Sequence, residues 1–247
     1  MSGTEHIVDL VRQSLGRRSN LEDDDIAALR ATPFTVRDMR AGQRLAWDGD
    51  RPQYCALLLE GFSFRSKLSG PGRRQILSIG VRGDFIDLQN ALLGVSDHNV
   101  EMLTPGRVAL FQTEAIKAIA LERPRVALAM WRETLIEASI FREWILNVGR
   151  RDALARVAHL LCEFALRLDL AALGSQHAYE LPITQEQLAD AVALTSVHVN
   201  RTLMRLEKDG FIHRSKRQIT IVDWHRMVDI ADFNARYLHV DEGDREP

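Results

Sequence analysis

The amide of Asn200 and the guanidinium groups of Arg201 and Arg205 lie on the same side of a short helix predicted near residues 196–208. The spacing directs five side chains outward from this helix: Ser196, Val197, Asn200, Arg201 and Arg205. Its buried stripe would consist of Val199, Leu203 and Leu206. Amide and guanidinium donors near the start of a braced helix suit hydrogen bonding to base edges in a DNA major groove. The same spacing also occurs in ordinary pairs of packed helices, which remain the alternative to DNA binding.

A second predicted helix precedes this one and would brace it. Thr184 is a hydroxyl N-cap, and Gln187 three residues later completes a capping box. Apolar residues then recur at helical spacing and predict the inner face: Leu188, Ala189 and Val192. Residues 193–195 interrupt the pattern, and Thr195 or Ser196 can cap the following helix. The segment therefore predicts two short helices joined by a tight turn.

A predicted two-stranded hairpin with a basic tip follows the helices. Phe211 and Ile212 begin one strand, residues 214–217 read Arg-Ser-Lys-Arg, and a return strand would contain Ile219, Ile221 and Val222. Residues 198–218 hold six Lys or Arg against two acids, whereas the whole chain carries −2. A solvated loop is the alternative, but this local charge favours nucleic acid. The candidate DNA contacts are Thr184, Ser196, Val197, His198, Asn200, Arg201, Arg205, Arg214, Lys216 and Arg217.

The string TQEQLADAVALTSVHVNRTLMRLEKDGFI, residues 184–212, resembles the winged helix-turn-helix of the Crp/Fnr family of bacterial transcription regulators. The resemblance covers roughly residues 20–225. It implies an α+β fold: an antiparallel β-roll (double-stranded β-helix-like) sensor domain over residues 1–124, a dimerisation helix over 125–150 and a DNA-binding domain over 151–240. It also implies a homodimer on double-stranded DNA, with RNA polymerase as a further partner if the protein is an activator.

The start of the recognition helix departs from the better-known relatives. Those read Arg-Glu-Thr-Val-x-Arg, whereas residues 196–201 read Ser-Val-His-Val-Asn-Arg. The family's final arginine is kept as Arg201, so a guanine in each half-site is expected. Val197 replaces the glutamate and could rest on a thymine methyl group. Asn200 could pair with adenine or hold a phosphate.

Residues 34–112 differ in pattern from the helical remainder. Glycines at 42, 49, 61, 70, 72, 80, 83, 94 and 106 separate short apolar stretches. Many short strands with regular turn signals predict a compact antiparallel roll or barrel.

A long helix is expected from about residue 125 to about residue 148, after a break at Pro124. Apolar positions recur every three or four residues: Met130, Trp131, Leu135, Ala138, Phe141, Ile145 and Val148. At 1.5 Å per residue the helix would be roughly 35 Å long. Packing against a twofold mate would bury this stripe. Packing on the roll alone is the alternative.

The roll could sense a small molecule, but cyclic AMP is not expected. Relatives that bind it carry Gly-Glu-x-x-Gly-Glu and then an Arg-Ser/Thr-Ala stretch. Here residues 83–88 read Gly-Asp-Phe-Ile-Asp-Leu and residues 97–100 read Asp-His-Asn-Val. An added carboxylate and a missing arginine would each oppose a phosphate. The roll is either a ligand-free scaffold or a pocket for another effector, with candidate residues Gly83, Asp84, Phe85, Asp87, Leu88 and His98.

No cofactor and no metal site are expected. The two cysteines, Cys55 and Cys162, cannot supply the four thiolates of an iron–sulfur cluster. Haem would need an isolated ligand such as His6, His98 or Cys55. Cys162 is core filler or a redox switch.

Other classes of protein find little support. There is no nucleophile elbow, Walker loop or H-E-x-x-H, so an enzyme is not expected. The alternatives to a DNA reader are a helix-turn-helix used for protein contact and a ligand-binding sensor without direct DNA readout. No apolar run approaches 18 residues and the first residues lack a signal-peptide pattern, which predicts a cytoplasmic protein without a membrane partner.

Overall fold

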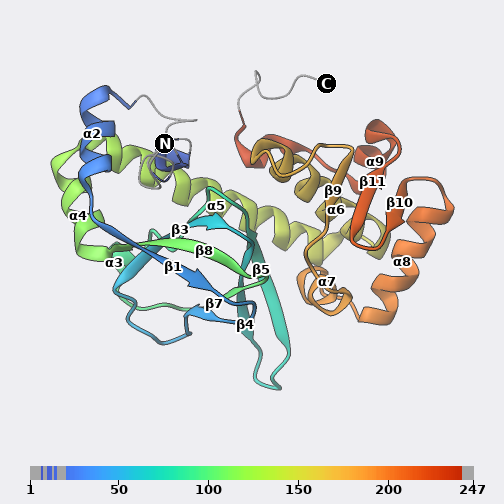
Figure 1. The fold of residues 1–247 in the computed structure, drawn as a ribbon. Helices are drawn as coiled ribbons and strands as arrows, with labels where there is room; N and C mark the ends of the chain where they lie inside the picture. Colours follow the sequence, from blue (N-terminus) through green and yellow to red (C-terminus); the bar gives the residue numbers. More distant parts are fainter. Residues whose placement is uncertain (1–6, 8–9, 13, 16–20, 241–247) are drawn as a thin grey trace. The chain divides into compact units, whose positions relative to one another are not determined.

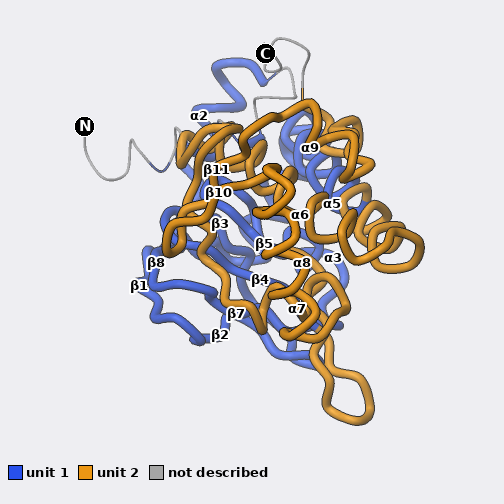
Figure 2. The backbone as a smooth tube through the Cα atoms, turned by 90° about the vertical axis from the view of Figure 1, so that its right-hand side faces the viewer, with its two compact units in different colours: residues 1–66, 79–138 blue, residues 67–78, 139–247 orange. Residues whose placement is uncertain are grey.

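The chain forms two compact units, which Figure 2 shows in different colours. The computed structural model describes residues 7, 10–12, 14, 15 and 21–240 of the 247. The first unit comprises residues 1–66 and 79–138, and the second comprises 67–78 and 139–247. The candidate haem ligand His6 lies outside the described residues. Helix α5 (Pro124–Arg150) begins in the first unit and ends in the second.

The antiparallel roll is built on two four-stranded sheets (Figure 1), ordered β1-β8-β3-β6 and β2-β7-β4-β5. Most of it belongs to the first unit, whereas the end of β4 and most of β5 fall in residues 67–78 of the second unit. Its strands are β1 (Phe34–Met39), β2 (Arg44–Ala46), β3 (Tyr54–Glu60), β4 (Ser63–Leu68), β5 (Arg74–Gly80), β6 (Phe85–Ile86), β7 (Asn99–Met102) and β8 (Gly106–Gln112). Its shorter helices are α2 (Asp23–Ala31), α3 (Asn90–Leu93) and α4 (Thr113–Glu122). Pairing is antiparallel, as in the register that joins β3 to β8. The predicted antiparallel roll is confirmed.

Strand β3 shows how an apolar run builds the roll. Cys55, Leu57 and Leu59 join a buried cluster that also contains residues of α4 and α5. Ala56 and Leu58 point the other way, into a cluster drawn from strands of both sheets. Successive side chains of a strand alternate between its faces, so β3 is covered on both sides. This double burial explains why residues 55–59 are continuously apolar.

The first half of helix α5 has one face in the roll and one in water. Val126, Ala129 and Met130 belong to the helix-covered core of the roll. Met130, predicted to lie in the dimer stripe, is therefore part of the core, and the prediction was wrong for this residue. On the other side Trp131 is 62% exposed and Leu135 is 52% exposed. The long predicted helix exists, and part of its apolar surface is already buried within the subunit.

The second unit surrounds a buried helix, α6 (Ala153–Leu170), whose residues from Val157 to Leu166 are all buried. The other elements are β9 (Ala178–Glu180), α7 (Gln185–Val192), α8 (Ser196–Lys208), β10 (Ile212–Ser215), β11 (Gln218–Ile221), α9 (Trp224–Ala231) and the 3₁₀ helix η1 (Ala235–Leu238). Strands β10, β11 and β9 form an antiparallel sheet in that order. Strand β9 was not predicted, because three residues are too few to show a period.

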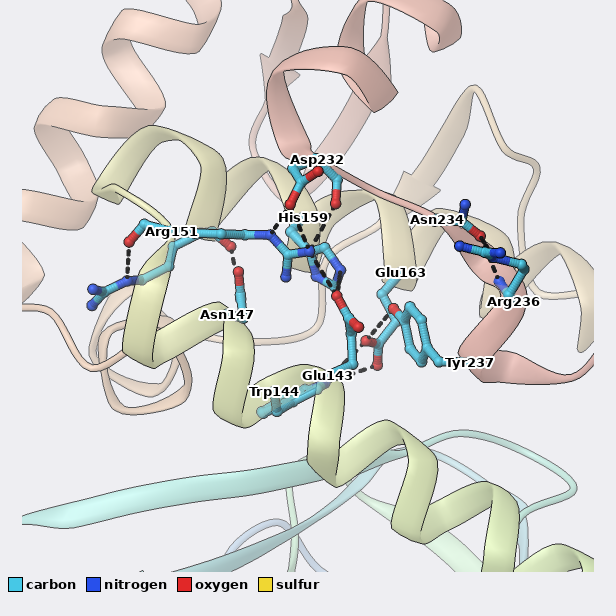
Figure 3. Close-up of polar contacts among 11 residues, drawn as sticks. Glu143, Trp144, Asn147, Arg151, His159, Glu163, Asp232, Asn234, Arg236 and Tyr237 are labelled. Carbon is cyan, nitrogen blue, oxygen red and sulfur yellow. Dashed lines mark hydrogen bonds and ion pairs between the residues drawn. The ribbon is translucent and has the colours of Figure 1, made fainter.

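Buried polar groups join the end of α5 to α6 and to the segment before and within η1 (Figure 3). The Glu163 carboxylate is 1% exposed and accepts hydrogen bonds from Trp144 Nε1 at 3.0 Å and Tyr237 Oη at 2.7 Å. Arg151 donates to Glu143 at 2.7 Å and to the Asp232 carbonyl oxygen at 2.8 Å. A buried charge is costly unless it is paired, so these contacts fix the last turns of α5 to the unit that carries α7 and α8.

His159 adds a buried ring to this network. It is fully buried on α6, with Nε2 at 3.1 Å from Glu143 Oε1. The nearby His159 ring lowers the pKa of Glu143; burial opposes this effect, and the Arg151 hydrogen bond adds to it. Glu143 is thus held ionised beside the His159 ring and the Arg151 guanidinium.

Candidate nucleic-acid interface

Helix α7 begins and ends as its sequence predicts. Thr184 Oγ1 accepts from the Gln187 amide at 3.2 Å, and Gln187 Oε1 accepts from the Thr184 amide at 2.9 Å. Ala193 ends the helix with a φ of 53°, a left-handed conformation that costs an alanine energy and turns the chain sharply. Leu188 and Val192 are buried, as expected for the bracing face. The predicted capping box and turn are confirmed.

Helix α8 starts two residues after this turn. Thr195 is its N-cap, with Oγ1 accepting from the His198 amide at 3.2 Å. Val199, Leu203 and Leu206 are buried, so the predicted inner stripe is confirmed. Thr202 is also buried, and its hydroxyl donates to the His198 carbonyl oxygen at 2.9 Å.

The opposite side of α8 faces solvent and carries the candidate reading groups. Ser196, His198, Arg201 and Arg205 are exposed, and Val197 is 62% exposed. Asn200 is partly buried and donates from Nδ2 to Gln185 Oε1 on α7, 3.1 Å away. An open hollow of about 380 Å³ runs beside this face and is lined by Ala153, Leu154, Thr195, Val197, His198, Arg201, Thr202 and Arg205. The face combines cations, an amide and a small apolar side chain, which is the mixture that base readout requires.

The wing is the β10–β11 hairpin. Ser215 pairs with Gln218 across a two-residue turn, and Lys216 in that turn has a φ of 55°. Lys216 and Arg217 are exposed at the tip. A phosphate backbone could reach both without displacing other groups.

Arg214 differs from the other wing cations. Its Nη2 and Nε donate to Glu207 Oε2 at 2.9 and 3.2 Å, and its backbone amide donates to Glu207 Oε1 at 3.1 Å. The side-chain and backbone hydrogen bonds from Arg214 lower the pKa of Glu207. The guanidinium is therefore engaged in tying the wing to α8, a role that sequence reasoning missed.

The candidate effector residues are gathered only in part. The backbone of Asp87 is left-handed, with a φ of 59°, and the residue is 3% exposed. Its Oδ1 accepts from Arg65 Nε at 2.7 Å, His98 Nε2 at 3.0 Å and Gln89 Nε2 at 3.2 Å. Arg65 also pairs with Glu137 on α5. We name Arg65, Asp87, His98 and Glu137 the roll ion cluster.

The cation paired with Asp87 is Arg65, which is distant in sequence from residues 97–100. Arg65 lies in β4, and no local pattern indicates that it meets Asp87. Burial disfavours ionisation of Asp87, but Arg65 and the His98 hydrogen bond outweigh it and hold the pKa of Asp87 well below its usual range. Burial also opposes charge on His98, yet Asp87 and then Asp97 raise its pKa. Burial raises the pKa of Glu137 in spite of Arg65.

The other candidate pocket residues serve the fold. Gly83 sits in a turn with a φ of 91°, and Asp84 Oδ2 accepts from the Val81 amide at 2.8 Å. Leu88 is in the helix-covered core, and the Phe85 ring lies 5.9 Å from that of Phe111. A cavity of about 80 Å³ beside Asp87 is far smaller than the roughly 300–1,000 Å³ of typical ligand sites. The cavity that adjoins Asp87 is therefore smaller than a typical nucleotide site.

Both cysteines lie in surroundings that disfavour a reactive thiolate. Cys55 and Cys162 are both buried. Burial raises the pKa of Cys55 to about 12 and also raises the pKa of Cys162, which disfavours the reactive thiolate. Within the described ranges, no three His, Cys, Asp or Glu side chains are grouped to hold a metal ion.

Among the described residues, no helix has both the length and the apolar character needed to cross a bilayer. The described fold and interface instead define a class of protein. A winged helix-turn-helix with a polar, cationic recognition face is carried by a chain that also holds an antiparallel roll. This combination is that of a DNA-binding transcription regulator.

Comparison with known proteins identifies the family. Residues 155–230 match the Crp-like helix-turn-helix domain. The chain is 28% identical over 214 residues to the transcriptional activator protein FnrL of Cereibacter sphaeroides, covering 85% of each chain. It is 30% identical over 174 residues to the nitrogen fixation regulation protein FixK of Bradyrhizobium diazoefficiens, covering 70% of this chain and 72% of FixK.

A solved structure agrees with these relatives. FixK2 from Bradyrhizobium japonicum superimposes with a TM-score of 0.72 at 24% identity, covering 80% of this chain and 97% of that one. The chain belongs to the Crp/Fnr family of transcription regulators. The predicted family, fold class and DNA-binding function are confirmed.

Proposed function

We propose that the protein acts in the cytoplasm as a homodimer that recognises an imperfect palindrome in double-stranded DNA. The observation that carries this proposal is the exposed polar face of α8, set over a buried stripe of the same helix. Residues 1–124, 125–150 and 151–240 are the proposed sensor-like, dimerisation and DNA-binding segments. No catalytic step is proposed, and an activator of this kind would also contact RNA polymerase.

Helix α5 supplies the proposed dimer contact. Trp131, Leu135 and Ile145 are 62, 52 and 69% exposed, and Ala138, Phe141 and Val148 are partly buried. Covering such a face with a twofold copy removes apolar surface from water on both subunits. A twofold dimer would direct two recognition helices at half-sites about one DNA turn apart, which is why the site should be palindromic.

Three residues of α8 are the proposed base readers. Arg201 is exposed and has the planar fork that pairs with guanine O6 and N7. Val197 can contact a thymine methyl group, and Asn200 can pair with adenine N6 and N7. Ser196, His198, Arg205 and the N-cap Thr184 would contact the backbone or lie beside it.

Lys216 and Arg217 at the wing tip are the proposed phosphate clamp. Phosphate contacts position a protein without reading sequence, and each one adds to the salt dependence of binding. Arg214 contributes less directly, because its guanidinium pairs with Glu207. We therefore assign the clamp chiefly to the tip.

Cyclic nucleotides are not the proposed effector. In the roll ion cluster the Asp87 carboxylate already occupies the Arg65 guanidinium, and the adjoining cavity of about 80 Å³ is small. A cyclic phosphate would have to displace a buried carboxylate from its cation, at the cost of an unpaired charge. Any effector of this protein would act by biasing two arrangements of the dimer.

Selection of binding sites from random DNA tests the proposal. The wild-type protein should enrich an imperfect palindrome with a guanine in each half-site. Arg201→Ala should cost about 1–3 kcal/mol per half-site and flatten the preference at one base pair. Lys216→Ala should weaken all sequences alike and reduce the salt slope by about one.

Lys117→Ala is the matched control, because it removes the same charge from an exposed position on α4. It should leave affinity and preference unchanged. If Arg201→Ala weakens all sequences equally while Lys216→Ala changes base preference, the assignment of reader and clamp is reversed. Enrichment of no sequence by the wild-type protein would refute the proposed function.

A further inference from the structure

We propose that Gln185, the first residue of α7, is a positioning residue that sets the base preference of Asn200. The inference rests on the proposed function, in which α8 reads bases. The Asn200 amide donates from Nδ2 to Gln185 Oε1 at 3.1 Å, across 15 residues of sequence. Gln185 therefore acts on the DNA surface through another side chain, and it determines specificity without itself reading a base.

Gln185 is held in a rigid place. The capping box between Thr184 and Gln187 closes the first turn of α7 around it. The far end of the helix is fixed by the left-handed Ala193, and both helices bury their inner faces. The Gln185 backbone therefore has little freedom, which limits where its exposed side chain can reach toward α8.

The hydrogen bond breaks the symmetry of the Asn200 amide. An asparagine amide has two N–H donors and one carbonyl acceptor, and a 180° rotation exchanges the two ends. In the structure Gln185 offers its oxygen to α8, so the nitrogen end of Asn200 points toward α7. One N–H and the Oδ1 acceptor then remain for another partner.

A donor beside an acceptor is the pattern that matches adenine, whose N7 accepts and whose N6 amine donates in the major groove. With Gln185 in place, Asn200 presents this pattern in one orientation before DNA arrives. Without it, both ends of the amide are accessible and the side chain must be ordered during binding. Gln185 thus converts an ambivalent amide into a reader of one base pair.

Neighbouring residues do not duplicate this role. Gln187 Oε1 is engaged by the Thr184 amide at 2.9 Å, so this second glutamine serves the cap. Glu186 lies one residue along on the exposed surface of the same turn. It provides a matched control, since Glu186→Gln changes the charge on the same turn of α7 and leaves the Gln185 oxygen in place.

The test is site selection and quantitative binding with full-length variants. Gln185→Ala should lower affinity for the preferred site by roughly three- to tenfold per half-site, and should flatten the preference at the Asn200 base pair alone. The guanine preference that depends on Arg201 should persist. The double variant Gln185→Ala/Asn200→Ala should lose no more affinity for the preferred site than Asn200→Ala alone, because the two residues act as one unit.

Gln185→Glu supplies the rescue. A glutamate keeps the acceptor for Asn200 Nδ2, so the base preference should return even though added negative charge weakens binding to all sequences. A residue that merely supported the fold would not shift the preference at a single base pair. Glu186→Gln should leave every base preference unchanged.

The inference is overturned if Gln185→Ala reduces binding to all sequences uniformly, which would make Gln185 a backbone contact or a structural residue. It is also overturned if Asn200→Ala leaves base preference unchanged. In both cases an Arg201-dependent guanine preference would leave the proposed function intact. Wild-type protein that selects no DNA would overturn both.

Discussion

Replacing Ile145 on α5 should separate the proposed dimer without damaging the subunit. The side chain is 69% exposed, so shortening it to alanine removes few contacts within the described subunit. The same cannot be said of Trp144 beside it, which is 6% exposed and donates to Glu163. Ile145→Ala is therefore a clean perturbation of the outer face.

The expected magnitude follows from the exposed fraction. Full burial of an isoleucine side chain contributes about 1.5–3 kcal/mol. With 69% still exposed, about 1–2 kcal/mol remains to be gained by each subunit. Twofold symmetry doubles this contribution to about 2–4 kcal/mol, so the dimer Kd should rise roughly 30- to 700-fold. Ile145→Asp should weaken the dimer further, because it leaves an unpaired charge in a desolvated seam.

Sedimentation equilibrium over a dilution series would measure this Kd directly. Val36→Ala is the control, since Val36 is 46% exposed but lies on β1. It should leave the monomer–dimer equilibrium unchanged. Ile145→Ala should also bind a palindrome more weakly at low protein concentration, because two half-sites then capture separate monomers.

A dimer Kd that Ile145→Ala leaves unchanged would refute the reasoning. The apolar face of α5 would then be covered by something other than its twofold copy. Loss of dimerisation in Val36→Ala as well would point to a general effect on folding.

Three further predictions concern the buried charges. Titration calorimetry with millimolar cyclic AMP or cyclic GMP should give no saturable heat, because Asp87 already pairs with Arg65; micromolar binding would contradict the assignment. The raised pKa of His98 means that its pairs with Asp87 and Asp97 stabilise the fold fully below about pH 6.5 and lose that contribution as pH rises through the folded pKa. Urea unfolding of wild type and His98→Gln should therefore differ most at pH 6 and converge at alkaline pH, and a difference that grows with pH would reverse the sign. Tyr237→Phe should cost about 1.5–3 kcal/mol, since it removes a 2.7 Å hydrogen bond to the buried Glu163 carboxylate; a urea midpoint equal to wild type would show that Trp144 suffices.

The helix-turn-helix was predictable because its signals are local. Each signal joins residues at most four positions apart in the sequence. These signals are the Thr184–Gln187 capping box, the Thr195 cap and the apolar stripes of both helices. Helical periodicity reports whether a side chain faces inward or outward, and here it did so for Val199 and Leu203 as well as for Arg201. The short apolar stretches separated by glycines in residues 34–112 indicated a roll for the same reason, because turn signals and apolar runs are local patterns.

Which side chain meets which partner was decided by the tertiary structure. Arg65 meets Asp87 only because β4 lies near the turn after β6, and Glu163 meets Tyr237 across 74 residues. Met130 was predicted to lie in the dimer stripe, but it is buried in the core of the roll, which covers that side of α5. A sequence period fixes the direction of a side chain from its own backbone, whereas its partner depends on how distant segments pack. The Gln185–Asn200 contact is of this second kind, since both residues were visible in the sequence and only the turn between α7 and α8 brought their amides together.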